Sequence, residues 1–367
     1  MKILEITFDL SPGGAERFVV DLSNELSKDN DVTLMAIKDD KVYSKKRLFY
    51  KFDLSNRVLY KNIGIKDGGS FGILCKIYKA IKAEHADVVH IHGSKMPHYC
   101  LMAILLLRKD VRFYQTIHCD IIRSYNSLFY KILFKANGYK HLMKFIALSE
   151  TNYKDLIQRY PKLNATCILN GRAPFHPSPL YNKVRTEMLD YKSNESSVLF
   201  LHVARCCLQK NQMLLVVAFK QLLERGYNAD LIVIGDGFDS KLGEKIKTAA
   251  CPRTHFLGTR QNIGDYMLNA DFFCLSSDFE GMPITILEAC LAGVPVLSTP
   301  VCGAVDVITD GVNGVISKGY SLREYVAALE HSYINMKEFK RNAMAMRTNN
   351  KYTIETCAKK YLEFFAN

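Results

Sequence analysis

The chain has 367 residues, of which 48% are apolar and 23% are charged, and its formal net charge is +12. These ordinary globular values exclude an intrinsically disordered, collagen-like or low-complexity chain. The best apolar run, residues 101–107, is far shorter than the roughly 20 residues that a membrane-spanning helix needs. Glu5 and Asp9 interrupt the apolar segment that a signal peptide requires. We therefore expect a soluble cytoplasmic protein, or one that lies on a membrane surface without crossing it.

The positive charge is concentrated in the first half of the chain. Residues 1–180 contain 28 Lys and Arg against 17 Asp and Glu, whereas the remaining residues contain 21 against 20. An excess confined to one half indicates an anionic partner for that half. The candidates are a membrane surface, a phosphorylated substrate and nucleic acid.

Short β-type runs alternate with helical patterns through the first half. The runs are continuous and rich in Val and Ile, which is typical of parallel strands buried on both faces. The expected strands are Ile3–Thr7, Val32–Ile37, Val88–Ile91, Phe113–Ile117 and Phe145–Leu148. The expected helices are Ala15–Leu26, Phe71–Ala83, Pro97–Leu107 and Tyr125–Lys135.

The pattern breaks at residues 171–197, which contain three of the ten prolines and the polar run KSNESS. We interpret this segment as the connection between two domains. The alternation then restarts and closes with a helix-patterned tail, residues 321–367. The expected strands are Val198–Val203, Leu231–Ile234, Thr254–Leu257, Phe272–Ser276 and Val294–Leu297, and the expected helices are Asn211–Leu223 and Pro283–Leu291. The repeated order predicts an α/β protein with doubly wound parallel sheets, whose ligands bind at the loops that follow the strands.

The eleven cysteines form no CxxC and no Cys/His ligand spacing. Most of them lie inside apolar runs, which favours buried thiols in a reducing compartment. We therefore predict no disulfide and no metal held by sulfur.

Two loops at predicted strand ends carry residues suited to an anionic ligand. SPGGAER, residues 11–17, opens a helix with paired glycines, where the backbone can approach a ligand and free N–H groups favour an anion. ARCCLQKN, residues 204–211, places Arg205 and Lys210 on either side of a strand-to-helix turn, as a diphosphate requires. Taken alone, the first is better explained by a tight turn and the second by solvated surface charges.

A third segment, FEGMPITILEACLAGVPVLST at residues 279–299, is more informative. Pro283 suits the first position of a helix, which leaves neighbouring backbone amides available to a phosphate or sugar oxygen. Those amides belong to Gly281, Met282, Ile284 and Thr285. Glu280 precedes the helix, and Glu288 lies about 7.5 Å along its axis from Pro283. Carboxylates are pure acceptors, so the pair suits sugar hydroxyls and a ribose diol.

This segment, with Glu280 and Glu288 eight residues apart, resembles the E-x7-E region of glycosyltransferase family 4. That family comprises retaining, nucleotide-sugar-dependent enzymes of the GT-B fold. Further pieces follow in the family's order: GGAER at 13–17, DVVHIHG at 87–93, TIH at 116–118, ALSE at 147–150, LNG at 169–171, VIGDG at 233–237 and HFLGTR at 255–260. One departure is Ala204, which stands where many relatives have glycine.

The resemblance implies two Rossmann-like doubly wound domains facing across a cleft. Residues 1–176 would form the acceptor-side domain and residues 177–345 the nucleotide-sugar-binding domain. Residues 346–367 would form a helix that packs back on the first domain. The segment 38–61 fits no pattern of the family.

The resemblance also implies roles for single residues. Arg205 and Lys210 would hold the donor diphosphate, and His118 would face the sugar near the reacting carbon. Glu280 would hold the donor sugar and Glu288 the ribose, while Gly14 would approach the phosphates from the other domain. The implied catalytic residues are His118, Arg205, Lys210 and Glu280, and the implied donor-binding residues are Gly14, Gly237, Leu257, Thr259, Arg260, Gly281, Met282, Pro283, Ile284 and Glu288.

These features predict a retaining hexosyltransferase that uses a UDP- or GDP-sugar. Its acceptor would be a saccharide or lipid-linked saccharide, in cell-surface polysaccharide biosynthesis of the capsule or lipopolysaccharide kind. The alternatives are a nucleotide-sugar 2-epimerase of similar fold and a non-catalytic sugar-nucleotide-binding subunit at the membrane. The family implies same-face attack with the phosphate taking the acceptor proton, so Glu280 is assigned to sugar positioning.

We expect neither a metal nor a cofactor, because the nucleotide sugar is a co-substrate and no Asp-x-Asp motif stands at a predicted strand end. His90 and His92 share a strand face, where lining of the core or cleft is the better interpretation than metal ligation.

Residues 121–144 combine aromatic and basic side chains. The aromatics are Tyr125, Phe129, Tyr130, Phe134 and Tyr139, and the cations are Arg123, Lys131, Lys135, Lys140 and Lys144. This composition fits an interfacial helix on the anionic inner face of the cytoplasmic membrane, and equally a core helix with its charged face in water. Nucleic acid is not expected, since the aromatics follow helical spacing rather than that of a strand platform.

Overall fold

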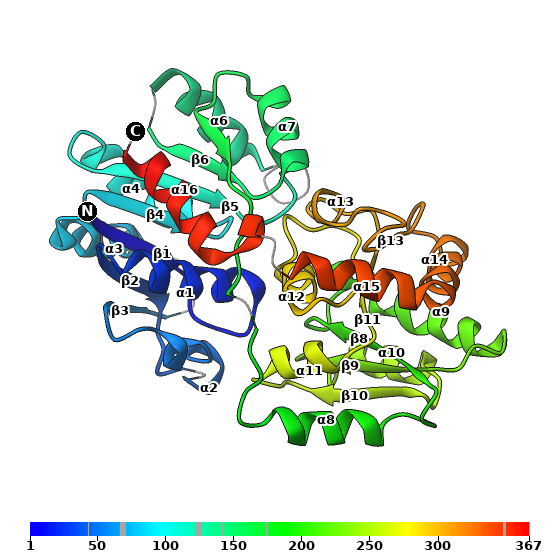
Figure 1. Ribbon diagram of the computed structural model, residues 1–367. Coiled ribbons are helices and arrows are strands. Elements are labelled where there is room, and N and C mark those ends of the chain that lie inside the picture. The colour runs from blue at the N-terminus through cyan, green and yellow to red at the C-terminus, as the bar shows by residue number, and fades with distance from the viewer. Residues whose placement is uncertain are drawn as a thin grey trace. The chain divides into compact units, whose positions relative to one another are not determined.

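The computed structural model (Figure 1) describes residues 1–42, 44–66, 71–121, 127–140, 142–173, 175–347 and 350–366. The chain divides into two compact units. The N-terminal unit comprises Met1–Ala173 together with Lys351–Asn367, and the C-terminal unit comprises Pro174–Asn350. The boundaries expected from the sequence were residues 176 and 345.

The N-terminal unit is built on a seven-stranded sheet in the order β3-β2-β1-β4-β5-β6-β7. Every neighbouring pair is parallel. The strands are β1 Lys2–Thr7, β2 Asp31–Lys38, β3 Val58–Ile65, β4 Val88–His92, β5 Arg112–Ile117, β6 Lys144–Ala147 and β7 Ala165–Cys167. The order reverses between β1 and β4, and the crevice at such a reversal is where open α/β sheets bind ligands.

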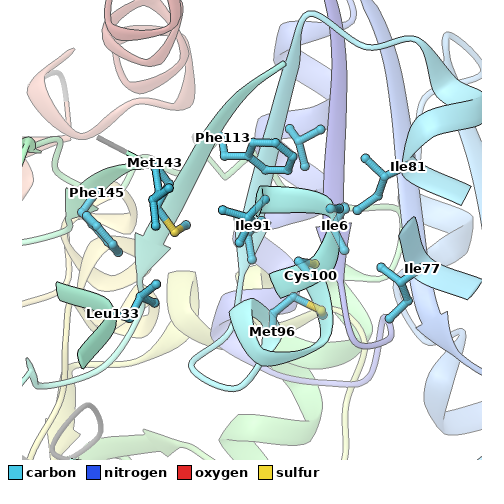
Figure 2. Packing of buried hydrophobic residues seen from close by; sticks show 14 of the residues in the cluster. Ile6, Ile77, Ile81, Ile91, Met96, Cys100, Phe113, Leu133, Met143 and Phe145 are labelled. Atoms are coloured by element: carbon cyan, nitrogen blue, oxygen red, sulfur yellow. The ribbon is translucent and has the colours of Figure 1, made fainter. Parts of the chain in front are cut away.

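Helices cover this sheet and bury its apolar residues. They are α1 Gly14–Leu26, α2 Ser44–Arg47, α3 Phe71–Glu84, α4 Met96–Leu107, α6 Leu128–Lys140, α7 Glu150–Arg159 and α16 Ile354–Ala366, with 3-10 turns at Lys51–Asp53 and Asn350–Tyr352. Figure 2 shows Ile6, Ile91 and Phe113 of the sheet packed beside Met96 and Cys100 of α4. All of these side chains are at least 98% buried.

The last helix, α16, returns to the N-terminal unit, where it packs against α1 and the start of β5 (Figure 1). Tyr361 and Phe365 on its inner face are completely buried. The Arg112 guanidinium donates a hydrogen bond to the carbonyl of Phe365, and the Tyr114 hydroxyl donates to the carbonyl of Phe364 at 3.2 Å. The helix thus completes the core of a unit whose sheet is formed by the first half of the chain.

The C-terminal unit contains a six-stranded sheet in the order β10-β9-β8-β11-β12-β13, again with parallel neighbours throughout. The strands are β8 Val198–Val203, β9 Ala229–Ile234, β10 Thr254–Gly258, β11 Phe272–Leu275, β12 Val296–Ser298 and β13 Gly314–Ile316. The helices are α8 Tyr181–Asp190, α9 Gln212–Glu224, α10 Lys241–Ala249, α11 Ile263–Asn269, α12 Ile284–Ala292, α13 Ala304–Val307, α14 Leu322–Ile334 and α15 Met336–Met346, with a 3-10 turn at Leu208–Lys210.

The interpretation of residues 171–197 as a connection is wrong in part, because α8 lies within it. Val184 and Met188, one helical turn apart, are buried. The flanking prolines and polar run are typical of a connection, and the apolar stripe of this helix is too short to outweigh them.

Three strands, β3, β7 and β13, were not predicted. All three lie at sheet edges, and β7 and β13 have three residues each. β3 is buried only at its two end residues, Val58 and Ile65, unlike the continuous apolar runs of the central strands. The segment 38–61, which fits no family pattern, thus includes the start of an edge strand.

All eleven cysteines are free. Within the described part of the chain, every helix is too short or too polar to span a lipid bilayer.

Replacing Phe365 with Ala removes a buried ring that lies 4.7 Å from the ring of Tyr114, centroid to centroid. We expect the free energy of unfolding to fall by about 3–5 kcal/mol, because a cavity opens between α16 and β5. Urea denaturation measures this change. Lys359→Ala, at an exposed position of the same helix, is the control and should stay within about 0.5 kcal/mol of wild type. Equal stability of the two variants would contradict a core role for α16.

Candidate functional site

The two central strands of the C-terminal unit place its two most informative loops side by side. β8 and β11 are parallel neighbours, so their carboxyl ends lie at the same sheet edge. The loop after β8 carries Arg205 and Lys210, and the loop after β11 carries Glu280 and leads into α12. The β–α order places both loops at one edge of a parallel sheet, whereas the neighbour relation of β8 and β11 comes from the structure.

Hydrogen bonds join these two loops along their length. The amide of Asp278 donates to the carbonyl of Gln209 at 2.8 Å, and the Ser276 hydroxyl donates to the carbonyl of Lys210 at 2.9 Å. The Asn211 amide group donates to Asp278 Oδ1 at 2.9 Å. Asn211 has a left-handed backbone (φ 44°) and caps α9 by accepting from the amide of Leu214. The loops therefore form one connected surface.

Glu280 lies at the centre of this surface and is only 7% exposed. Its Oε1 accepts a charge-assisted bond from Lys210 Nζ at 2.5 Å and another from the Ser277 hydroxyl at 2.6 Å. Gln209 donates to the neighbouring carbonyl of Phe279 at 2.8 Å. A buried carboxylate is unfavourable unless it is paired and hydrogen-bonded, and these donors provide both conditions.

Arg205 lies on the same surface with its side chain exposed. Within the part of the chain that the structure describes, no hydrogen bond or ion pair engages its guanidinium. Only its backbone carbonyl is bonded, by the side-chain amide of Gln212 at 2.8 Å. Its five N–H donors can therefore grip an anion, which a guanidinium does in a bidentate manner.

The start of α12 differs from the expectation in one respect. Pro283 is the N-cap (φ −65°, ψ 115°), and the helix begins at Ile284, so Pro283 is not the first helical residue. The backbone of Pro283 is extended, as is typical of an N-cap residue. Its carbonyl accepts the first hydrogen bond of the helix, from the amide of Ile286 at 3.1 Å. The amides of Ile284 and Thr285 then point out of the helix start. Glu288 lies on the next turn and is 6% exposed.

Gly303 supports the backbone before α12 and was not singled out from the sequence. Its φ is +74°, and a Cβ there would lie 2.7 Å from both the carbonyl oxygen of Gly281 and Cα of Met282. Only glycine combines this conformation with this approach. No local sequence pattern identifies this glycine, because the residues that it approaches are remote in the sequence.

A third loop, after β9, joins the same surface. The amide of Cys206 donates to the carbonyl of Asp236 at 2.8 Å, and a Cβ on Gly235 would lie 1.9 Å from the carbonyl oxygen of Ala204. Gly237 has φ +88°. The structure thus brings Arg205, Lys210, Gly237, Glu280 and Gly281 together on adjacent loops.

The residues after β10 line a separate hollow of about 550 Å³. Arg260 is fixed there, since its Nε donates to the Tyr266 hydroxyl at 3.0 Å and its guanidinium pairs with Glu187 at 3.2 Å. Its guanidinium also donates to the carbonyl of Leu257. The lining residues are Ser178, Pro179, Leu180, Thr259, Arg260, Gln261 and Asn262.

Two of the expected site residues, Gly14 and His118, belong to the N-terminal unit. Gly14 is the first residue of α1, and His118 directly follows β5. The ring of Phe18 on α1 meets that of His118 edge to face at 5.8 Å. His118 Nε2 lies 2.9 Å from His92 Nδ1. Burial, together with repulsion from His92, lowers the pKa of His118 well below its usual value, so its imidazole is neutral at pH 7.

His90 and His92 line the core, as expected, but their partner was not predicted. Both approach the buried carboxylate of Glu5 on the neighbouring strand β1. Glu5 lies opposite His90 in the parallel register. The sequence shows that His90 and His92 lie on the same face of a strand. That this strand lies beside β1, which carries Glu5, follows only from the strand order of the sheet.

Two family descriptions match the chain. "Glycosyltransferase Family 4" matches residues 12–172, and "Glycosyl transferases group 1" matches residues 184–346. The first match lies within the N-terminal unit, and the second lies within the C-terminal unit.

Proteins of similar sequence carry glycosyltransferase names. An uncharacterized glycosyltransferase from Methanocaldococcus jannaschii is 29% identical over 243 residues, which are 61% of this chain and 58% of that protein. An Escherichia coli protein named UDP-Gal:alpha-D-GlcNAc-diphosphoundecaprenol alpha-1,3-galactosyltransferase is 27% identical over 284 residues, which are 74% of this chain and 72% of that protein. The chain thus spans little more than half the length of the archaeal relative.

Solved structures show the same architecture. Anabaena HepE in complex with UDP and glucose matches with a TM-score of 0.82 at 20% identity, over 100% of this chain and 99% of that one. TarM matches with a TM-score of 0.78 at 13% identity, over 100% and 99% of the two chains. With two parallel-sheet units of the GT-B fold and a family match to each, this chain belongs to glycosyltransferase family 4.

Proposed function

We propose that this glycosyltransferase moves a hexose-type sugar, with retention, from a nucleotide sugar to a saccharide or lipid-linked saccharide in cell-surface polysaccharide biosynthesis. The observation that supports this proposal is the surface formed by the two hydrogen-bonded loops that follow β8 and β11. It combines an unengaged guanidinium at Arg205 with an ammonium at Lys210 that is held 2.5 Å from the buried carboxylate of Glu280. Cations and a pure acceptor on one surface suit a ligand that joins a diphosphate to a sugar.

Arg205 and Lys210 bind the donor diphosphate in this proposal. Breaking the bond between sugar and phosphate builds negative charge on the departing phosphate, and fixed cations at that point stabilise the transition state. The first amides of α12 add the partial positive charge of a helix N-terminus. Gly237, which has no Cβ, leaves room for the phosphates beside Cys206.

Glu280 and Glu288 bind hydroxyl groups of the donor in this proposal. The amides of Gly281 and Met282 assist Glu280 with the sugar, and Glu288 accepts from the ribose diol. The hollow lined by Thr259 and Arg260, with Leu257 at its edge, receives the base. From the N-terminal unit, Gly14 approaches the phosphates and His118 faces the sugar.

Glu280 positions the sugar and does not attack it. Its Oε1 already accepts from Lys210 and Ser277, and two such bonds hold a carboxylate in place and reduce its nucleophilicity. The phosphate of the donor then takes the acceptor proton on the same face. We propose that this transfer needs no divalent ion.

The names of similar proteins support the substrate class. The solved structures of Anabaena HepE contain UDP or UDP-glucose, and the E. coli relative is named for a diphosphoundecaprenol-linked acceptor. A Campylobacter jejuni relative, 23% identical over 330 residues, is also named for a PP-undecaprenol-linked acceptor. A UDP-sugar, with a GDP-sugar next, is therefore the donor to test first, with a lipid-linked saccharide as acceptor.

A panel of UDP- and GDP-sugars, with an undecaprenyl-diphosphate-linked saccharide, tests the proposal by release of nucleoside diphosphate. We expect acceptor-dependent release that persists in excess EDTA. Lys210→Ala should lower kcat by about 10²–10³, since a cation at the leaving phosphate is lost. Lys220→Ala, at an exposed position of α9, is the matched control and should retain activity.

Other outcomes of this assay would contradict the proposal in distinct ways. An altered nucleotide sugar released without acceptor indicates the epimerase alternative. Thermal stabilisation by the donor without any turnover indicates a non-catalytic binding subunit. A glycosyl adduct trapped on Glu280 in the wild-type protein, and absent from Glu280→Gln, would overturn the positioning role of Glu280.

We further propose that α6 contacts an anionic membrane surface. Leu128 and Ile132, one turn apart, are 73% and 59% exposed, and Lys131 and Lys135 are exposed beside them. Apolar side chains flanked by cations suit an anionic interface, and the unit carries most of the net charge of the chain.

The aromatic residues of the segment 121–144 do not contribute as first expected. Tyr130 and Phe134 are buried in the core of the unit, and Phe129 stacks on His98. Residues 122–126 and 141, including Arg123 and Tyr125, lie outside the described part of the chain, as do the side chains of Tyr139 and Lys140. Among the side chains of α6 that the structure describes, the exposed apolar ones, Leu128 and Ile132, are aliphatic.

Co-sedimentation with anionic phospholipid vesicles at low salt tests this contact. We expect the double variant Leu128→Ser/Ile132→Ser to bind at least about 10-fold more weakly, because each buried Leu or Ile contributes about 1.5–3 kcal/mol. Leu189→Ser/Ile334→Ser, which removes two exposed apolar residues of the C-terminal unit, is the control. Equal binding of both double variants, or no binding of the wild type, would contradict the contact.

A further inference from the structure

A chain of polar side chains runs through the core of the N-terminal unit, and His118 is the only one of them to which the proposed function assigns a role. Glu5 on β1 and His90 on β4 are completely buried, and His92 is 1% exposed. His118, after β5, is only partly buried. Ionisable groups in such a place are unfavourable unless they satisfy one another, so their arrangement needs an explanation.

Three of these groups form a continuous line from the core to a partly exposed position. Glu5 Oε2 lies 2.6 Å from His92 Nε2, and His92 Nδ1 lies 2.9 Å from His118 Nε2. The parallel neighbours β1, β4 and β5 supply one group each. We call Glu5, His92 and His118 the His118 arm.

The positions of the protons in this arm follow from its chemistry. Burial alone would raise the pKa of Glu5, but His90 and His92 outweigh it and lower the pKa to about 2, so the group is a carboxylate at pH 7. A carboxylate only accepts hydrogen bonds. His92 Nε2 must therefore carry a proton, and this N–H donates a hydrogen bond to the Glu5 carboxylate.

The next link follows in the same way. Burial, with repulsion from His90, lowers the pKa of His92 to about 4, so its ring is neutral at pH 7 and has one N–H. Because that N–H faces Glu5, Nδ1 of His92 carries no proton and accepts from Nε2–H of His118. His118 is also neutral, which leaves its Nδ1 without a proton.

We propose that Glu5 and His92 are positioning residues that hold His118 in its Nε2–H tautomer, so that His118 presents Nδ1 as an acceptor for a hydroxyl of the donor sugar. The second part rests on the proposed function, which assigns His118 to the sugar. In a neutral imidazole the hydrogen bond at one nitrogen sets the role of the other. A tautomer fixed before the donor binds orients the ring and needs no proton shift on binding.

The geometry favours a hydrogen-bonded arm over a metal site, although Glu5, His90 and His92 are a possible ligand set. Ligands of a tetrahedral zinc ion lie about 2.0–2.2 Å from the metal and therefore about 3.3 Å from one another. Glu5 Oε2 and His92 Nε2 are only 2.6 Å apart, which is the separation of a short hydrogen bond.

A second arm on the other side of Glu5 supplies a matched control. His90 Nδ1 lies 2.9 Å from Glu5 Oε2, and His90 Nε2 lies 2.7 Å from the hydroxyl of Thr116. That hydroxyl lies 3.0 Å from the hydroxyl of Tyr361. Tyr361→Phe therefore removes a buried hydrogen bond of the same cluster without touching the His118 arm.

The test is a two-bond ¹H–¹⁵N spectrum of the full chain with ¹⁵N-labelled histidine, which reports the protonated nitrogen of each ring. The signals of His118 are those lost in His118→Asn. We expect Nε2–H at His118 in the wild type and in Tyr361→Phe. In Glu5→Leu, His92 Nε2–H loses the carboxylate that accepts its hydrogen bond. We then expect the proton of His92 on Nδ1, from which it donates to His118 Nε2, and the proton of His118 on its own Nδ1.

Three results would overturn the inference. One is a His118 that carries its proton on Nδ1 in the wild-type protein. This result is measured without any variant, so it does not depend on whether a variant folds. Another is a folded Glu5→Leu whose His118 keeps the wild-type tautomer. The third is a shift of His90 and His92 on addition of ZnCl₂ with loss of the His92 Nε2 proton, which would make the cluster a metal centre.

Kinetics with the donor found in the panel test the link to transfer. Glu5→Leu should lower kcat about 10–100-fold, by analogy with the loss of a group that orients a metal-ligating histidine, with the donor KM unchanged. Tyr361→Phe should retain the wild-type kcat. A moved tautomer with unchanged kcat would overturn the role in transfer. A wild type without transferase activity would contradict the proposed function and leave the tautomer result standing.

Discussion

The ion pair between Lys210 and Glu280 is the contact on which the C-terminal site depends. It joins the loop after β8 to the loop after β11 at 2.5 Å, with Glu280 buried and Lys210 partly buried. Removing one partner of such a pair leaves the other charge uncompensated, which is far less favourable than losing an exposed pair. The pair therefore sets the spacing of the two loops and keeps a negative charge beside the two cations of this surface, Arg205 and Lys210.

The two units solve the problem of a buried carboxylate in different ways. In the C-terminal unit, an ammonium and a hydroxyl neutralise Glu280, and the arrangement can change when an anion competes for Lys210. In the N-terminal unit, two imidazoles approach Glu5, and the surrounding core leaves that arrangement fixed. The arrangement around Glu280 suits a group that must exchange partners with a ligand. The arrangement around Glu5 suits a group that must keep a neighbouring side chain in one orientation.

Much of this architecture follows from the sequence because it depends on local patterns. The central strands are continuous apolar runs, and Arg205, Lys210 and Glu280 follow directly from two of them, so their meeting at one edge needs only a parallel sheet. Of the edge strands, β7 and β13 are short and β3 is buried only at its ends, so their formation depends on pairing with the neighbouring strand. Glu5 and Gly303 act through contacts with residues remote in the sequence, His92 for the first and Gly281 for the second, and no local pattern carries that information.

The return of α16 to the N-terminal unit has a consequence for how the protein is made. Tyr361 and Phe365 fill the core of a sheet formed by the first half of the chain, yet they are translated after the whole of the C-terminal unit. The earlier unit therefore waits, with an apolar face uncovered, while the whole of the later unit emerges from the ribosome. The core of this unit is completed only after α16 has left the ribosome, and until then that face is open to chaperones.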